Sequence, residues 1–203
     1  MRFGVWLLST LIYAVALGSF DSTMASAAEH PTNQVQRLIQ AIGTMKSADN
    51  GHLASERMAH HTSAAQQANA ILDIAGVGQW ALGKHWRVRT PAERVEFIAL
   101  LEALFTKVAY PKTAAFFTDY KIEVLDERIN GTRAMVRTTV HDPKEGLIAV
   151  DYRLIQNNGS WRVRDILLDD VSLATNLRSQ FNKIISTDSY GELLRRMRVK
   201  IAE

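Results

Sequence analysis

The chain has 203 residues, a formal net charge of +3 and a pI near 9.3, and it contains no cysteine. The lack of cysteine excludes disulfide bonds, thiol catalysis and cysteine-based zinc or iron–sulfur sites. So small an excess of basic charge permits contact with anionic head groups but does not require nucleic acid, and we expect no nucleic-acid partner.

The N-terminus has the pattern of a secretory signal peptide. Arg2 is followed by an apolar run from Phe3 to Phe20 and by Ala25-Ser26-Ala27, a small-residue cleavage site. We therefore expect residues 1–27 to be removed on export and residues 28–203 to form one mature domain. A retained membrane anchor is the alternative, because the run is near the lower length limit of a spanning helix.

Helical periodicity dominates the first half of the mature chain. Apolar spacing predicts a helix over about 33–48, whereas the polar, Ala-rich stretch 51–69 fits either a helix or a loop. An apolar region then follows, broken by Gly76 and Gly78. Thr90-Pro91-Ala92-Glu93 has the pattern of a capping box with proline at the first helical position, so a helix should begin there. We expect this helix to be covered on most sides and to end at Pro111.

Four strand-like runs follow, at about 120–126, 132–140, 147–155 and 161–168, with turn signals between them. Short turns between successive strands predict an antiparallel meander with one apolar face. A bulge in the last strand would decide which face Trp161 and Val163 share. Two helices, the first capped by Ser172, complete the chain. The predicted fold is α+β, with a curved four-stranded antiparallel sheet and helices around an apolar cavity.

No catalytic or metal-binding motif stands out: the sequence has no GxSxG, HExxH or GxxxxGK[ST]. Adjacent His60 and His61 would point about 100° apart on a helix and chelate poorly. Asp151 or Asp165 beside Tyr152 is the one grouping that could transfer protons in an apolar cavity. Since alternation places Asp151 opposite Tyr152, we expect these carboxylates to pair with arginines on the solvated face. We expect no metal and no cofactor.

Basic and aromatic residues gather in two places, Lys84–Arg89 and Arg195–Lys200. Tryptophan beside lysine and arginine suits a membrane interface or a phosphate head group, although solvated helix ends have a similar composition. The other aromatic residues fall on apolar faces, where core packing is the simplest interpretation of each one. Together they supply much apolar surface for a domain of this size, which is compatible with a lined cavity.

Three blocks of sequence, in this order, match a family pattern. They are Ala81-Leu82-Gly83-Lys84-His85-Trp86 with Thr90-Pro91; Tyr152-Arg153-Leu154 with Gly159 to Ile166; and Val171-Ser172-Leu173 with Asn176 and Arg178-Ser179-Gln180-Phe181. Together these blocks resemble the MlaC / toluene-tolerance Ttg2 family. The chain departs from the pattern at Asp170, where the family usually has glycine, and at Leu177, where it usually has tyrosine.

The resemblance implies a Gram-negative periplasmic protein that binds phospholipid by its acyl tails and leaves the head group near the cavity mouth. Such proteins maintain outer-membrane lipid asymmetry. They pass lipid between an outer-membrane lipoprotein complex and an inner-membrane ABC transporter with an MCE-domain ring. A monomeric carrier without turnover is therefore expected. The alternatives are a carrier of hopanoid or another hydrophobic ligand, an enzyme on a similar curved sheet, and an adaptor that holds no ligand.

On this basis we assign candidate lipid contacts. The head group or a membrane would contact Lys84, Arg87 and Arg178. The acyl tails would contact apolar residues of the sheet and the surrounding helices: Trp80, Leu82, Trp86, Phe97, Leu101, Leu104, Phe105, Val108, Phe117, Val136, Val150, Tyr152, Trp161, Val163, Leu173, Leu177 and Phe181.

Overall fold

The computed structural model describes residues 29–48 and 54–203. The predicted signal peptide, residues 1–27, lies outside the described residues, as do residues 51–53 of the Ala-rich stretch. Within the described ranges, no helix is both long enough and apolar enough to cross a membrane.

The first half of the described chain is helical, as its periodicity predicts. The elements are α1 (Pro31–Ala48), α2 (Ala54–Ile71), α3 (Ile74–Leu82), α4 (Lys84–Arg87), α5 (Pro91–Leu104), the π-helical turn η1 (Phe105–Ala109) and α6 (Tyr110–Asp119). The Ala-rich stretch, for which helix and loop both fitted, forms α2. The capping box of α5 is confirmed, because Thr90 Oγ1 accepts from Glu93 N (3.2 Å) and the Glu93 carboxylate accepts from Thr90 N (2.8 Å).

The prediction that Pro111 ends the helix is wrong. The helical run continues from α5 through η1 into α6, and Pro111 lies in the first turn of α6. The turn before it is wider than an α-helix, since Tyr110 N donates to Phe105 O five residues back. Proline lacks an N–H and clashes with an ordinary preceding turn, so the π turn lets the chain stay helical.

The two glycines that were expected to break the apolar region both lie inside α3. Gly78 faces α5: a Cβ atom there would lie 2.6 Å from Ile98 Cδ1 and 3.0 Å from side-chain atoms of Phe97 and Leu101. The absence of a side chain at Gly78 therefore allows α3 and α5 to pack closely.

The strands form an antiparallel meander, as predicted. They are β1 (Lys121–Asn130), β2 (Arg133–Asp142), β3 (Gly146–Asn157), β4 (Ser160–Leu168) and β5 (Val171–Ser172), in the order β1-β2-β3-β4-β5. The fifth strand, which the sequence did not indicate, has two residues. It turns back onto β4 through Asp169 and Asp170, both of which have positive φ.

A bulge in β4 sets which side chains face the helices. Leu154 pairs with Val163 and Arg153 pairs with Asp165, so Arg164 is the extra residue. Trp161 and Val163 therefore share a face with Tyr152. Beyond the bulge Ile166, rather than Asp165, stands opposite Tyr152 on that face.

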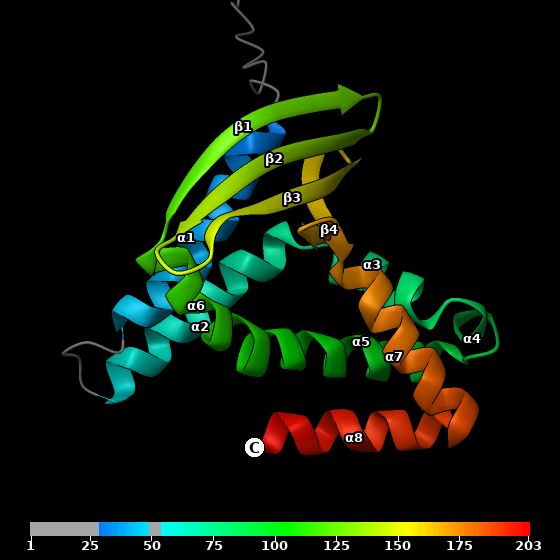
Figure 1. The fold of residues 1–203 in the computed structure, drawn as a ribbon. Helices are drawn as coiled ribbons and strands as arrows, with labels where there is room; N and C mark the ends of the chain where they lie inside the picture. The colour runs from blue at the N-terminus through cyan, green and yellow to red at the C-terminus, as the bar shows by residue number, and fades with distance from the viewer. Residues whose placement is uncertain (1–28, 49–53) are drawn as a thin grey trace, which may run out of the picture.

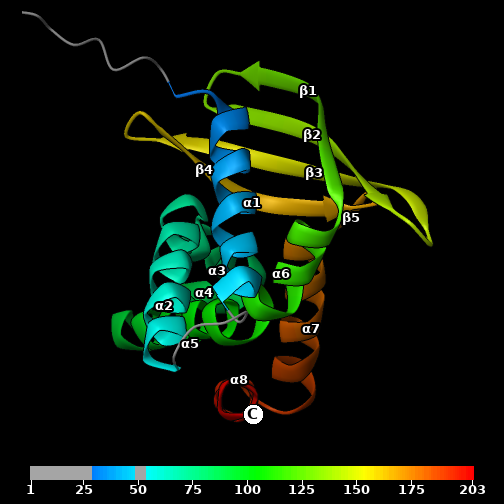
Figure 2. The ribbon, with the colours of Figure 1, turned by 90° about the vertical axis from the view of Figure 1, so that its left-hand side faces the viewer.

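The sheet arches over the helices, and α1 lies against its apolar face (Figures 1 and 2). Helix α7 (Leu173–Thr187) runs down from β5 beside α3, and α8 (Tyr190–Ala202) packs under α5. One continuous core joins these layers. It includes Leu38 and Met45 from α1, Phe97 and Leu101 from α5, Val136, Tyr152 and Val163 from the sheet, and Leu193 and Met197 from α8.

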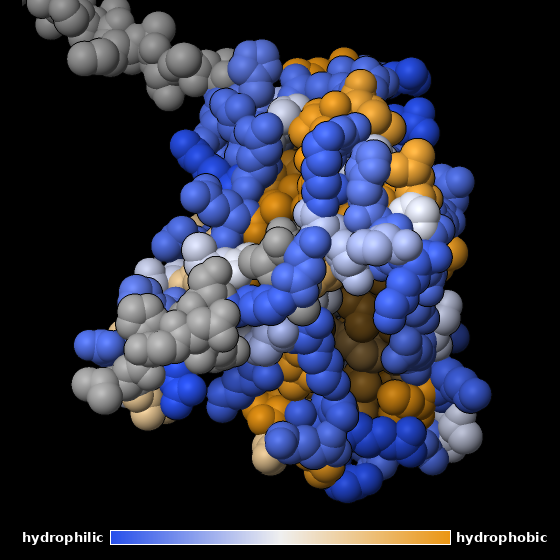
Figure 3. Space-filling model, turned by 60° about the vertical axis from the view of Figure 1, so that its left-hand side comes forward, coloured by the Kyte–Doolittle hydropathy of each residue, from blue (hydrophilic) through white to orange (hydrophobic). Residues whose placement is uncertain are grey.

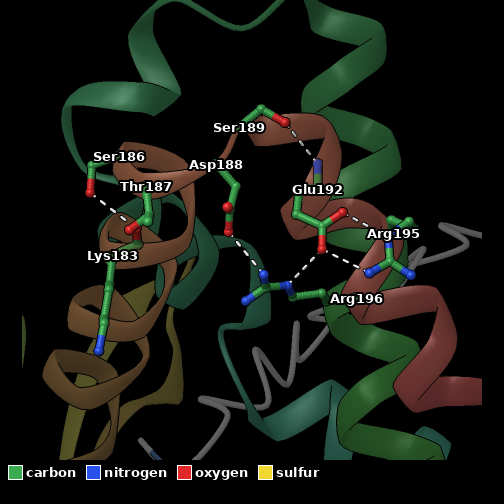
Figure 4. Close-up of polar contacts among 8 residues, drawn as sticks. All are labelled: Lys183, Ser186, Thr187, Asp188, Ser189, Glu192, Arg195 and Arg196. Atoms are coloured by element: carbon green, nitrogen blue, oxygen red, sulfur yellow. Dashed lines mark hydrogen bonds and ion pairs between the residues drawn. The ribbon is translucent and has the colours of Figure 1, made fainter.

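A polar network holds the corner between α7 and α8 (Figure 4). Ser189 caps α8 by accepting from Glu192 N (3.1 Å). The Glu192 carboxylate accepts from Arg195 (2.7 and 2.8 Å) and from Arg196 (2.8 Å), and Arg196 also pairs with Asp188 (2.9 Å). The corner fixes the direction in which α8 returns beneath α5.

Candidate ligand-binding site

An apolar cavity of about 370 Å³ lies between α3, the α5–η1 run, β4 and α7. Ligand pockets in proteins typically have volumes of about 300–1,000 Å³. Figure 3 shows apolar side chains at the base of a hollow on one face of the molecule, flanked by hydrophilic ones. The lining is mainly apolar, from Leu72, Val77, Leu101, Leu104, Phe105, Val108, Ala109, Val163, Ile166, Leu173, Ala174, Leu177 and Phe181, with Arg164, Asp165, Asn176 and Gln180 as its polar members.

Local structure explains how these residues meet. Leu173, Leu177 and Phe181 are four residues apart, so they fall on one face of α7. Phe105 and Val108 belong to the π turn, which faces that side of α7. Phe181 packs edge-on against Phe97, with ring centroids 5.8 Å apart, and so ties α7 to α5.

Eight of the predicted tail contacts line this cavity: Leu101, Leu104, Phe105, Val108, Val163, Leu173, Leu177 and Phe181. Six others lie in the packed core rather than on the cavity wall: Leu82, Phe97, Val136, Val150, Tyr152 and Trp161. Trp80 and Trp86 line a separate groove, and the side chain of Phe117 lies outside the described residues. Lining residues that the sequence did not single out include Val77, which is next to Gly76, and Ile166, which the β4 bulge turns inward.

A groove of about 520 Å³ brings the three predicted head-group residues together. Lys84, Arg87 and Arg178 line it with Gly76, Gln79, Trp80, Gly83, Trp86 and Arg164; these nine residues are called the basic groove below. Arg178 lies over the Trp80 ring, 4.6 Å from its centroid, and donates to Trp80 O (3.3 Å). The Trp80 side chain is 52% exposed, so an aromatic surface stands beside cations at the edge of the domain.

Arg164 belongs to both the cavity and the basic groove. Its guanidinium pairs with the nearly buried Asp73 through Nε (2.9 Å) and through Nη2. Asp73 is fixed in turn, because its carboxylate caps α3 at Gly76 N (3.0 Å) and its backbone N–H donates to Val163 O (2.9 Å). This arrangement fixes the Arg164 guanidinium, paired with Asp73, in the wall that the two hollows share.

The carboxylates considered for proton transfer are engaged elsewhere. Asp151 pairs with Arg137 (3.4 Å) on the sheet face away from Tyr152. Asp165 accepts from Ser172 Oγ (2.7 Å), Ala174 N (3.0 Å) and Arg153 (3.3 Å). Pairing with arginine is therefore confirmed, although both carboxylates are nearly buried rather than solvated.

The Tyr152 hydroxyl is buried and makes no hydrogen bond of normal geometry to the described residues. Burial raises the pKa of Tyr152. No group of three His, Asp or Glu side chains in residues 29–48 and 54–203 could hold a metal ion. The site that the described residues form is thus an apolar cavity beside a cationic groove.

Comparisons with known proteins agree with this architecture. A solved structure of a phospholipid-binding protein from Ralstonia solanacearum, in complex with a phospholipid, is similar with a TM-score of 0.68; it is 21% identical, over 84% of this chain and 94% of that chain. A likeness at this level of identity shows the fold. No curated protein matches the sequence. The model of the family described as MlaC protein matches residues 33–199, and the chain therefore belongs to the MlaC protein family.

Proposed function

We propose that this protein is a non-enzymatic phospholipid carrier of the periplasm. The observation that carries the proposal is the cavity between α5–η1, β4 and α7, which is lined almost entirely by apolar side chains. Family membership and the phospholipid bound by the similar Ralstonia protein support it. The N-terminal export pattern supports the location.

The cavity suits an acyl chain in both chemistry and size. A cavity of about 150 Å³ accepts benzene, so by proportion 370 Å³ has room for about fifteen carbon atoms. Each buried methylene is worth about 0.8 kcal/mol, and a tail of that length therefore gains on the order of 12 kcal/mol by leaving water. One tail fills the cavity at this size.

The polar members of the lining orient the lipid. Asn176 and Gln180 lie on α7 beside Leu173 and Leu177, while Arg164 and Asp165 lie on β4. The tail therefore enters the apolar part and the head group stays at the polar edge, which Arg164 joins to the basic groove. Head groups left in water need no catalytic machinery, which agrees with the engaged carboxylates of the site.

Transport between membranes requires partners. We propose that the protein receives lipid from an outer-membrane lipoprotein complex and exchanges it with an inner-membrane ABC transporter that carries an MCE-domain ring. Family membership supports this part of the proposal.

Native mass spectrometry of the exported protein, purified without detergent, tests the carrier function. We expect a complex with phospholipid at one lipid per chain, identified after extraction. A co-purified hopanoid or other polycyclic lipid would change the ligand class. A bare polypeptide that takes up no lipid from phospholipid vesicles would contradict the proposal.

A further inference from the structure

Three hollows of the molecule meet at Arg164. The first is the apolar cavity and the second is the basic groove. The third, of about 700 Å³, lies between α3, neighbouring ends of β1, β2 and β3, the bulge of β4 and the start of α7, and it shares Arg164, Asp165 and Ala174 with the cavity. The basic groove and the third hollow share Gly76 and Trp80 with each other. A ligand tail in the cavity therefore has two cation-lined hollows next to it.

In the lining of these two hollows, cationic side chains outnumber carboxylates. Their lining contains seven cationic side chains, Lys84, Arg87, Arg128, Arg133, Arg153, Arg164 and Arg178, and one carboxylate, Asp165. The sequence places no acidic residue between Asp73 and Glu93 or between Asp170 and Asp188. Helices α4 and α7 thus bring cations to this surface without counter-charges from the same segments.

Four of the seven cations have no carboxylate within ion-pair distance among the described residues. Arg128 pairs with Asp126, Arg153 with Asp165 and Arg164 with Asp73. Within residues 29–48 and 54–203, no ion pair involves the other four, which are Lys84, Arg87, Arg133 and Arg178. Three of these unpaired cations line the basic groove.

Arg178 is held in place by neutral groups. Its guanidinium stacks on Trp80 and donates to the Trp80 carbonyl. Gly83, at φ +53°, makes room for it, because a Cβ atom there would lie 3.0 Å from Arg178 Nη2 and 3.1 Å from its Cζ. The guanidinium is therefore positioned without being neutralised, and its remaining N–H groups are free to bind an anion.

We infer that the basic groove binds the phosphate of an anionic lipid head group, so that the carrier prefers anionic to zwitterionic phospholipid. The inference rests on the proposed function and adds a head-group preference to it. A phosphate receives donors from Arg178, Lys84 and Arg87, whereas the ammonium of a zwitterionic head group meets cations of its own sign. The carboxylates nearby are already engaged, since Asp73 pairs with Arg164 and Asp165 accepts three hydrogen bonds.

Competitive loading measures this preference. The lipid-free exported protein is mixed with vesicles that contain equal amounts of phosphatidylglycerol and phosphatidylcholine with identical acyl chains. The bound lipids are then quantified by mass spectrometry. Each cation near an anionic lipid strengthens binding by a factor of about five. We therefore expect the lipid bound to the wild type to be enriched at least about five-fold in phosphatidylglycerol relative to the vesicles.

Variants locate the source of the preference. Lys84→Gln/Arg87→Gln removes two exposed cations of the groove and should bring the bound ratio toward that of the vesicles. Arg178→Gln should lower the ratio further. Lys144→Gln/Arg162→Gln makes the same charge change at two exposed residues that line neither of the two cation-lined hollows, and should keep the wild-type ratio.

Different results would contradict different parts of the proposal. Equal loading of both lipids by the wild type, or an enrichment that survives in the groove variants, would overturn the head-group assignment while leaving the carrier function intact. Inorganic phosphate that binds the lipid-loaded protein at the groove, without any phosphatidylglycerol enrichment, would assign the groove to free phosphate and overturn the lipid assignment. A wild type that takes up neither lipid would contradict the carrier function itself, and the inference with it.

Discussion

Gly76 supports the wall between the cavity and the basic groove. A Cβ atom at this position would collide with the Asp73 carboxylate and lie 2.5 Å from Arg164 Nη2. Gly76→Ala should therefore displace Asp73, with loss of the α3 cap and of the ion pair to Arg164. Loss of a cap alone costs about 1 kcal/mol, and the better helix propensity of alanine offsets up to about 1 kcal/mol. The steric clash adds a cost of about 1–3 kcal/mol, so we expect a net loss of at least about 1 kcal/mol.

Urea unfolding of the Gly76→Ala variant checks this prediction. Gly191→Ala is the matched control, since Gly191 is also helical and its added Cβ would meet its nearest neighbour at an ordinary 3.7 Å. The control should be neutral or slightly more stable than the wild type. If Gly76→Ala proved as stable as Gly191→Ala, the close approach of Asp73 and Arg164 to Gly76 would not hold in solution.

Individual residues also show which features could not be predicted from the sequence. Alternation correctly placed Val150, Tyr152 and Leu154 on one face of β3, because side chains in a strand alternate strictly. The same rule cannot locate the bulge at Arg164, which depends on how β4 pairs with β3. Ile166 was therefore missed as a cavity residue, and so was Arg164 as the side chain common to three hollows.

At the scale of elements, the α7–α8 corner depends on one carboxylate. Hydrogen bonds from Arg195 and Arg196 lower the pKa of Glu192 to about 2, below its ordinary value near 4.5. A depressed folded-state pKa means that the stabilisation is present above about pH 4.5 and is lost as the pH falls toward 2. Glu192→Gln should therefore be less stable than the wild type at pH 7, and this difference should shrink between pH 4.5 and pH 2.

Thermal unfolding at a series of pH values measures this difference. Glu145→Gln serves as a charge-matched control, because Glu145 is exposed in the β2–β3 turn and should give no comparable pH-dependent difference. A gap between wild type and Glu192→Gln that stays constant down to pH 2 would show that the Glu192 carboxylate does not stabilise the corner.

Elements with strong local signals were predictable, and those set by tertiary packing were not. The capping box at Thr90 and the Ser172 cap of α7 are confirmed because both rest on hydrogen bonds within one turn. The passage of the helix through Pro111 depends on a π turn that packs against α8. Strand β5 has only two residues, too few for any alternation to be read.

For the whole molecule, apolar periodicity identifies buried faces but not the empty space between them. Phe97 and Leu104 lie on the same helix, yet Phe97 is packed in the core and Leu104 lines the cavity. That difference depends on the position of α7 relative to α5, which apolar periodicity does not determine. The α+β class and the meander could therefore be predicted, whereas six of the proposed tail contacts proved to be core residues.

Removal of lipid should lower the stability of the whole domain. A ligand at about 100 times its Kd stabilises the native state by about 2.7 kcal/mol. For a domain of this size, each kcal/mol shifts Tm by about 2–4 °C, so the delipidated protein should melt about 5–10 °C below the loaded one. Calorimetry before and after delipidation, followed by reloading from vesicles, checks this. An unchanged Tm would mean that the lipid does not occupy the interior.

The most direct test of the account is to fill the cavity and measure lipid occupancy by native mass spectrometry. Leu177 and Leu104 line the cavity from opposite sides, on α7 and α5, and Leu147 is 68% exposed at the start of β3. Leu177→Trp and Leu104→Trp should each lose most of the bound phospholipid while retaining cooperative unfolding. Leu147→Trp, the matched control, should keep wild-type occupancy. Full occupancy in both cavity variants would contradict the placement of the acyl chain between α5–η1, β4 and α7.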